Sequence, residues 1–302
     1  QFAQAWWQWS PRWSLLAGAR HSSVRFESDD RYITDRNPDD SGHRRYRATT
    51  PVAGVSFEAS PQWRLHVATG RGFETPTFNE LGYRADGQAG LALDLAAARS
   101  RNVEVGSKWR TQQGTQLDIS VFRADTDNEL AVASSSAGRS TYRNIGRTRR
   151  QGAELQYRQP LGEQLELQLA WTWLQAQVRS PYLTSNSVVA AGSRLPGVPR
   201  QQGFARLQWS PGPWQWALEA SASSDTVVND VATERAPGYA LLNLEAGHRW
   251  RLPGGELRAF ARLENVLDQA YIGSVIVNDG NGRFYEPGPG RRANVGLQWS
   301  WR

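Results

Sequence analysis

The sequence predicts an all-β protein, a transmembrane antiparallel β-barrel in which neighbouring strands run up and down. Three observations predict this fold class. Apolar and polar residues alternate over many short runs, the connections between these runs are short and long in turn, and tryptophans gather beside the short connections. Period-two alternation is typical of strands with two unlike faces, and a meander with two unlike ends is typical of membrane barrels. No stretch reaches the roughly 20 apolar residues that a membrane-spanning helix requires.

The predicted strands follow one another along the whole chain. In the clearest run, LELQLAWTW at 165–173, Leu165, Leu167, Leu169, Trp171 and Trp173 share one face and the residues between them share the other. Thirteen strands are predicted, and they begin near residues 2, 13, 49, 63, 100, 116, 148, 164, 200, 214, 238, 256 and 290.

The connections fall into two classes. Short turns are predicted at 10–12, 60–62, 111–115, 159–163, 210–213 and 252–255, and long polar loops at about 29–48, 71–99, 129–147, 181–199, 225–237 and 272–289. Proline in WSPRW, SPQW and WSPGPW suits a short turn, because its ring presets φ and it needs no ladder partner. The short turns therefore share one rim and the long loops share the other.

Tryptophan marks the rim with the short turns. Indole rings settle where hydrocarbon meets water, so the tryptophans near the turns and the C-terminus are predicted to form a membrane-interface girdle. Its members are Trp9, Trp13, Trp63, Trp209, Trp214, Trp250, Trp299 and Trp301.

The second face of the strands is polar almost throughout. It carries Glu58, Glu104, Lys108, Asp118, Glu154, Arg158, Glu245 and Arg249. In a membrane barrel this face lines the lumen while the apolar face meets lipid. A soluble β-rich module also alternates and remains the alternative, but the unlike loop lengths and the tryptophan rim favour the barrel.

Composition argues against several function classes. The net charge of +6 is spread along the chain without a basic tail, which does not favour nucleic acid as a partner. Without cysteine there is no disulfide or thiolate metal site, and the four histidines lack ligand spacing, so no metal site is predicted. No nucleophile motif or phosphate loop is found. We therefore expect neither an enzyme nor a bound cofactor.

Five stretches, in this order, carry a family resemblance. They are GRGFETPTFNELGY (70–83), SRNVEVGSKWR (100–110), YRNIGRTRRQGAELQY (142–157), RLPGVPRQQGFARLQW (194–209) and RLENVLDQAYIGS (262–274). Together they resemble the barrel of TonB-dependent outer-membrane receptors. The resemblance implies a 22-stranded barrel with a plugged lumen, of which residues 1–302 would be the C-terminal portion with about the last thirteen strands. The start at Gln1, the lack of methionine and the odd strand number fit such a portion, with the plug and the TonB box lying upstream.

The resemblance also implies roles for two glutamates. Glu104 in NVEVGSK and Glu154 in QGAEL match inner-wall positions that pair with arginines of the family's own N-terminal plug domain. The alternative is that both are hydrated lumen carboxylates paired with neighbours such as Lys108 or Arg158.

The implied function is energy-dependent uptake across the outer membrane of a Gram-negative bacterium. The cargo would be a scarce nutrient, most often a ferric siderophore, and the TonB complex would act through the plug. Loop 71–99 is the best candidate for ligand contact because it is long and carries Phe73, Phe78, Tyr83 and Arg84, although a loop that folds inward to support the barrel is equally expected. A passive porin-like or structural barrel without energy coupling is the alternative function.

The expected membrane partners are outer-membrane lipid and lipopolysaccharide. Arginines border the first and third long loops, where they would pair with lipopolysaccharide phosphates or keep the loops hydrated; a role in contacting an anionic ligand is the less favoured alternative. They are Arg44, Arg45, Arg47, Arg147, Arg149 and Arg150.

Overall fold

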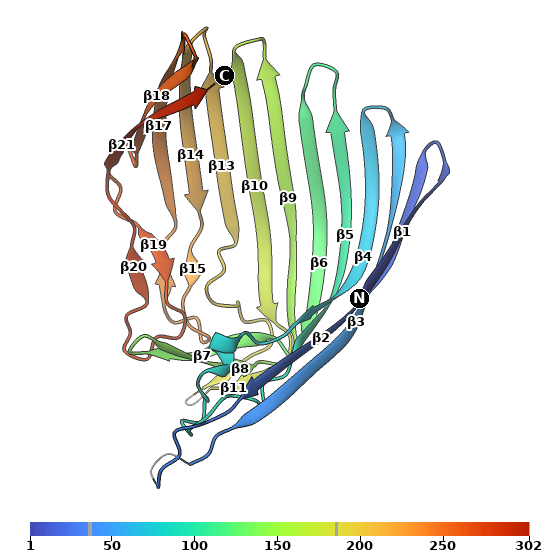
Figure 1. Cartoon of the computed structure of the whole chain (residues 1–302), viewed down its shortest axis with the longest axis vertical. Coiled ribbons are helices and arrows are strands. Elements are labelled where there is room, and N and C mark those ends of the chain that lie inside the picture. Colours follow the sequence, from blue (N-terminus) through green and yellow to red (C-terminus); the bar gives the residue numbers. More distant parts are fainter. Residues whose placement is uncertain (36–37, 185–186, 302) are drawn as a thin grey trace.

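The computed structural model describes residues 1–35, 38–184 and 187–301, and it forms one large antiparallel sheet with smaller hairpins at one end (Figure 1). Positions 36–37 and 185–186, inside the first and fourth predicted loops, lie outside the described residues. Across the described sheet the thirteen strands are β1 (Phe2–Ser10), β2 (Trp13–Ser28), β3 (Gly42–Ser60), β4 (Trp63–Glu74), β5 (Ala98–Arg110), β6 (Gln116–Asp127), β9 (Thr148–Leu161), β10 (Leu165–Val178), β13 (Gln201–Trp209), β14 (Trp214–Ser223), β17 (Tyr239–Leu252), β18 (Gly255–Glu264) and β21 (Arg292–Trp301).

The long loops contain short elements of their own. Four two-stranded sheets are formed by β7 (Leu130–Ser136) with β8 (Arg139–Asn144), β11 (Tyr182–Leu183) with β12 (Val188–Val189), β15 (Thr226–Val227) with β16 (Arg235–Ala236), and β19 (Ile272–Val275) with β20 (Tyr285–Pro287). A single four-residue helix among the described residues, α1 (Phe78–Leu81), lies in the loop between β4 and β5. No helix in the described part of the chain is long and apolar enough to span a membrane.

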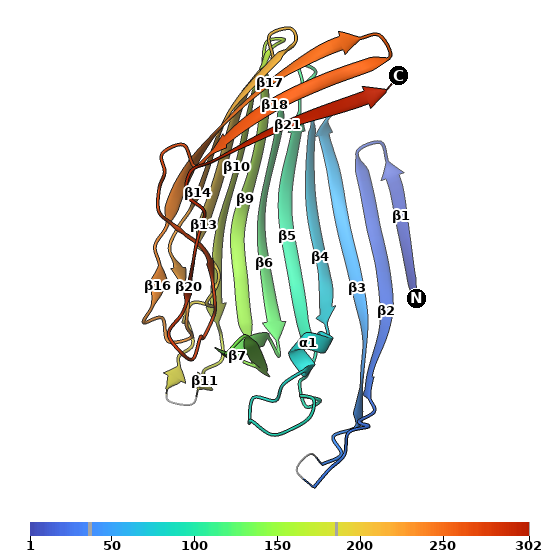
Figure 2. The same ribbon diagram turned by 60° about the vertical axis from the view of Figure 1, so that its left-hand side comes forward.

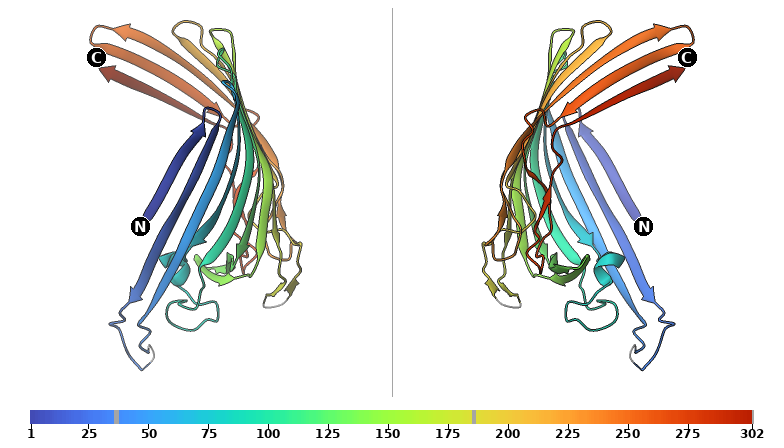
Figure 3. Two further views of the ribbon diagram at one scale, coloured as in Figure 1. Left: turned by 90° about the vertical axis from the view of Figure 1, so that its right-hand side faces the viewer. Right: turned by 90° about the vertical axis from the view of Figure 1, so that its left-hand side faces the viewer.

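The predicted all-β meander is confirmed. Every strand of the large sheet pairs with the next one along the chain, and β1 and β21 are its two edges. Figures 2 and 3 show the sheet curved into an open trough, with the short turns at one end and the long loops, α1 and the small hairpins at the other. Of the predicted strand starts, only that of β3 is wrong by more than two residues, since β3 begins at Gly42 rather than near residue 49.

The repeated proline turns have a shared local chemistry. In the first turn the Ser10 hydroxyl accepts a hydrogen bond from the Arg12 N–H at 3.3 Å, and in the second the Ser60 hydroxyl accepts from the Gln62 N–H at the same distance. A serine that bonds the backbone two residues on closes a turn locally. Each of these turns reverses the chain between strands that pair at Ser10↔Trp13 and Ser60↔Trp63.

The two faces of the sheet differ as the alternation predicts. We call the face that the long loops cover the inner face, and the opposite one the outer face. Large apolar side chains stay exposed on the outer face, among them Val67, Val103, Val105, Ile119, Val121, Leu207, Leu218, Leu244, Val295 and Leu297. A soluble protein rarely exposes so extended an apolar surface, whereas a barrel wall in lipid requires one.

Buried apolar clusters occur instead at the loop end. One contains Leu81, Ala92 and Leu95, and the other contains Ile145, Ala176, Val178, Val189 and Leu195. The packing that resembles a protein core therefore holds the loops in place, while the wall is held by its backbone ladders.

Candidate functional site

The loop end of the trough is the candidate site, and the loop between β4 and β5 carries three of the four predicted ligand residues. This loop spans 75–97, shorter than the predicted 71–99, because β4 continues to Glu74 and β5 begins at Ala98. It folds inward: Leu81 and Leu95 pack against Phe26 of the inner face, and the Tyr46 hydroxyl donates to the Leu95 carbonyl at 2.8 Å. The loop thus braces the wall along part of its length.

The helix α1 positions the exposed aromatic residues of this loop. A capping box fixes its first turn, because the Thr77 hydroxyl accepts from the Glu80 N–H and the Glu80 carboxylate accepts from the Thr77 N–H. Phe78 follows the cap and is 58% exposed, and Tyr83 just beyond the helix is 45% exposed. The guanidinium of Arg139 lies 5.1 Å from the Tyr83 ring centroid, so β8 contributes a cation to the same surface.

The other two predicted ligand residues lie in different settings. Arg84 donates to Asp86 through Nε at 3.0 Å and Nη2 at 2.5 Å. This hydrogen bonding lowers the pKa of Asp86 to about 2, so the Arg84 guanidinium is neutralised within its own loop. Phe73 belongs to β4 opposite Arg99, on the outer face that Arg71 shares. The structure therefore groups Phe78, Tyr83 and Arg84 in the loop and places Phe73 on the wall.

A single asparagine joins three of the loops. The Asn278 side chain donates to the Val132 carbonyl at 2.8 Å and accepts from the Asp230 N–H at 3.0 Å. Its backbone N–H donates to the Val228 carbonyl, and its φ of 54° lies in the left-handed region that asparagine tolerates. No sequence motif predicts the linking role of Asn278, because its side-chain partners are 48 and 146 residues away.

A buried ion pair joins the same loops. Arg143 Nη2 lies 2.5 Å from an oxygen of Asp230, whose side chain is only 5% exposed, and the Arg143 guanidinium stacks 5.0 Å from the Tyr182 ring centroid. Burial raises the pKa of Tyr182, so its hydroxyl stays protonated. The loops are thus a connected lid of hairpins over the inner face.

The predicted wall glutamates lie on the inner face and line one cavity of about 500 Å³. An oxygen of Glu104 is 3.0 Å from His66 Nε2. Arg158 bonds Glu166 at 2.9 and 2.6 Å, so the pairs suggested with Lys108 and Arg158 are not the ones that form. Glu154 lies across from Ser120 and Thr172, which leaves its carboxylate facing the trough.

A larger charge network covers the inner face toward the C-terminus. Arg206 bonds Glu219 and Glu245 at 3.1 Å each. Further pairs extend the network across five neighbouring strands and join Arg262 to Glu219, Glu245 and Glu264, Arg258 to Glu245, and Arg292 to Glu264. The sequence placed such residues on the polar face, but the network depends on register and cannot be found from spacing alone.

The tryptophans predicted for the girdle gather at the turn end. Trp9 and Trp13 stack with centroids 5.7 Å apart, Trp214 stacks on Trp216 at the same distance, and His248 lies between Trp214 and Trp250. Trp299 is half-buried against Gly255, and the other predicted members are exposed. Trp109 beside Trp63 shares the position.

Taken together, the loop end offers groups that are suited to binding a ligand. Exposed aromatic rings and a cation lie above a polar, charge-paired wall. Among the described residues no group of three or more histidine, aspartate or glutamate side chains is arranged to hold a metal ion.

Known proteins resemble this chain in sequence and in structure. The metal-pseudopaline receptor CntO of Pseudomonas aeruginosa (strain UCBPP-PA14) is 28% identical over 238 residues, which are 78% of this chain and 31% of that protein. Among solved structures, the copper transporter OprC superposes with a TM-score of 0.77 at 14% identity, covering 98% of this chain and 46% of that one. The siderophore receptor PiuA from Acinetobacter baumannii gives 0.75 at 16% identity, with 95% and 41% covered.

These comparisons agree with the architecture. The chain spans about a third of the length of the curated relative and less than half of each solved structure. The family described as TonB dependent receptor-like, beta-barrel matches residues 1–266. The chain therefore belongs to the TonB-dependent receptor β-barrel family.

Proposed function

We propose that this chain is the C-terminal barrel portion of an outer-membrane receptor that imports a metal complex, in particular a ferric siderophore, with energy from the TonB complex. Family membership supports outer-membrane transport. The names of relatives, a metal-pseudopaline receptor and a siderophore receptor, support a chelated metal as the cargo class.

The observation that carries the proposal is the loop lid. Hairpins from distant parts of the chain interlock over the inner face through Asn278 and Asp230, and the loop 75–97 leaves the rings of Phe78 and Tyr83 exposed at the same end of the trough. Aromatic rings beside a guanidinium fit a planar, anionic chelate, because the rings give apolar area and the cation gives charge complementarity. In this proposal the outer-membrane lipid, the plug and a ligand each contact a different surface of the wall.

The test is uptake by the full-length receptor in iron-limited cells. Radiolabelled iron is supplied on a panel of siderophores to strains with and without TonB. We expect TonB-dependent uptake of one chelate class. Phe78→Ala with Tyr83→Ala should weaken binding of that chelate about 5- to 150-fold, because the two aromatic contacts that the ligand would bury contribute about 1–3 kcal/mol together. Asn281→Ala, a polar change on another outer loop, is the control.

Two outcomes would contradict this function. Equal uptake without TonB, together with solute flux set only by size, would favour the passive porin-like barrel. Unchanged affinity in the Phe78 and Tyr83 variants would remove loop 75–97 from the ligand site.

A further inference from the structure

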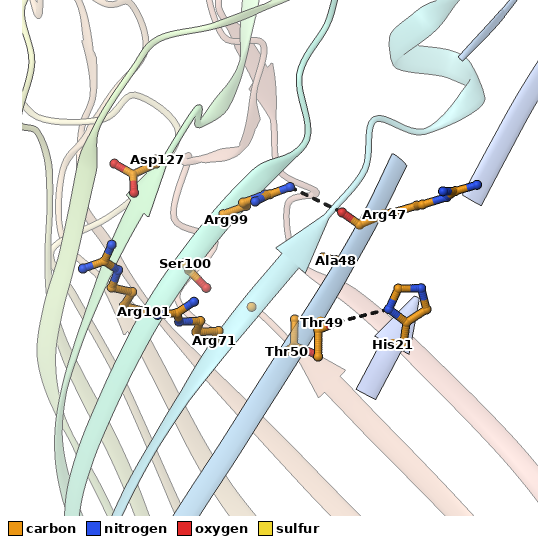
Figure 4. A pocket seen from close by; sticks show the side chains of 11 residues that line it. His21, Arg47, Ala48, Thr49, Thr50, Arg71, Arg99, Ser100, Arg101 and Asp127 are labelled. Atoms are coloured by element: carbon orange, nitrogen blue, oxygen red, sulfur yellow. Dashed lines mark hydrogen bonds between the residues drawn. The ribbon is translucent and has the colours of Figure 1, made fainter. Parts of the chain in front are cut away.

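The strands β3 and β4 of the wall separate toward the loop end and leave a gap between them. The last ladder pair of β3 and β4 is Val52↔Gly70. The next residue of β3 is Pro51, which has no N–H to donate and so ends the ladder. Beyond it β3 continues with β2 to Gly42, and β4 continues with β5 to Glu74. The gap forms a cavity of about 530 Å³, shown in Figure 4.

Four arginines line this gap: Arg47, Arg71, Arg99 and Arg101. All four are exposed on the outer face, since Arg71 lies four residues from Val67 and Arg101 two residues from Val103 on alternating strands. They therefore stand immediately beyond the apolar band, on the side of the long loops. His21 and Asp127 complete the charged or titratable side chains of the lining, so the gap is strongly positive.

The charges of these arginines are uncompensated. Within the described residues none of the four makes a salt bridge, and Arg99 donates only to the Arg47 carbonyl, at 3.3 Å. Arg71 and Arg101 are direct cross-strand partners, an arrangement of like charges that destabilises a sheet. Asp127 is the cross-strand partner of Arg99 but forms no ion pair with it.

Two other arginines of the outer face have their charges paired with a carboxylate. Arg123 and Arg149 both bind Asp125, at 2.7 and 2.6 Å. The inner-face arginines of the C-terminal network are likewise paired with glutamates. The four arginines of the gap differ from these paired ones, and Arg147 and Arg179, which also make no salt bridge among the described residues, line a neighbouring cavity. The gap therefore favours an anion from outside the chain.

We propose that this gap binds the phosphate of an outer-leaflet phosphorylated glycolipid. Guanidinium groups bind phosphate through paired, charge-assisted hydrogen bonds, and the Thr49 hydroxyl, bonded to His21 at 3.1 Å, lies at the same cavity. The position selects the source of the phosphate: the apolar band below the gap holds acyl chains, so a headgroup rests at this height on the outer face. A cargo that crosses the lumen passes the inner face instead. The inference rests on the proposed outer-membrane location and not on the identity of the cargo.

The experiment measures lipid binding by the full-length receptor. The protein is purified in mild detergent, delipidated, and titrated with phosphatidylcholine vesicles that contain diphosphorylated lipid A. Arg71→Gln with Arg101→Gln is expected to weaken binding about tenfold or more, because two charge-assisted contacts to the phosphate are lost. The matched control Arg44→Gln with Arg123→Gln also removes two cations, one on the inner face and one already paired, and should change affinity less than threefold.

Further arms distinguish the source of the anion. Dephosphorylated lipid A should bind the wild type as weakly as the double variant binds the intact lipid, and inorganic phosphate at equal concentration should not compete. Equal binding by the two double variants, equal binding of dephosphorylated lipid A, or full competition by inorganic phosphate would each overturn the proposal. Heat-modifiable gel migration verifies that each variant is folded, and single Arg71→Gln and Arg101→Gln variants replace the double one if it is not. TonB-dependent uptake, measured separately, is expected to persist in the double variant.

Discussion

At the scale of the residue, the alternation along a strand predicts on which face of the sheet a side chain lies, but not which side chain it bonds. Alternation correctly placed Glu104 and Glu154 on the inner face, yet Glu104 bonds His66 and Arg158 bonds Glu166. The partner is decided by register, which sets Ala68 opposite Glu104 and brings His66 within diagonal reach. Register is fixed by turn geometry and by bulges, such as the one between Glu58 and Ser60, that a sequence pattern does not display.

The two wall glutamates yield a prediction for the plug. Glu104→Gln with Glu154→Gln in the full-length receptor removes two carboxylates from one cavity of the inner face, and plug arginines that bind them would lose charge-assisted partners. We expect hydrogen exchange in the plug to become at least about tenfold faster, since even one such bond contributes about 1.5–3 kcal/mol and about 1.4 kcal/mol is a factor of ten. Glu256→Gln, another inner-face change near the turn end, is the control. If exchange protection of the plug is unchanged in the double variant as well, Glu104 and Glu154 are ordinary hydrated carboxylates that do not bind the plug.

At the scale of the element, the strands of the large sheet were predictable and those of the loops were not. Wall strands expose one face to lipid, so their period of two is long and regular. Hairpins such as β11–β12 and β15–β16 have two residues per strand, too few for any period, and are held by contacts like that of Asn278 with Val132. For β3, the seven missed residues lie past Pro51, where arginine replaces the apolar residues that revealed the strand.

Two salt bridges of one loop carboxylate predict acid sensitivity. Asp225 binds Arg194 at 2.8 Å and Arg235 at 3.1 Å, which joins the segment after β12 to the β15–β16 hairpin. Hydrogen bonding from Arg194 lowers the pKa of Asp225 below its ordinary value of 3.8. Because the folded pKa is the lower one, the stabilisation is complete above pH 3.8 and is lost as the pH falls through the folded value.

Limited proteolysis of residues 187–200 in the full-length receptor checks this expectation. Cleavage should rise between pH 5 and about 2.5 in the wild type with an acid-active protease. Asp225→Asn should already be cleaved faster at pH 5 and depend less on pH. Asp86→Asn, which breaks a pair inside a single loop, should leave cleavage at 187–200 unchanged. A variant Asp225→Asn with wild-type cleavage at both pH values would show that the pair does not hold the two loops.

At the scale of the whole molecule, the described sheet is a wall with two open edges. β1 and β21 each pair on one side only, and the views in Figure 3 show them as separate margins of the trough. Unpaired backbone groups at a sheet edge are costly inside a bilayer, where no water replaces the missing partner, and in water they recruit other strands. The apolar outer face must also be covered, because it is stable only against lipid.

This architecture predicts how residues 1–302 behave when produced alone. Refolded from urea into detergent micelles or phosphatidylcholine vesicles, they are expected to form oligomers or aggregates through the edges β1 and β21, and not a heat-modifiable monomer. Crosslinking between cysteines introduced at Ala5 of β1 and Val295 of β21 should occur between two copies, because the trough holds these positions on opposite margins. The same pair at Ala205 and Ala220, cross-strand partners within the wall, should link within one copy and serves as the control. A monomer that migrates faster before heating, with Ala5Cys and Val295Cys joined in the same chain, would show instead that thirteen strands close a smaller barrel by themselves.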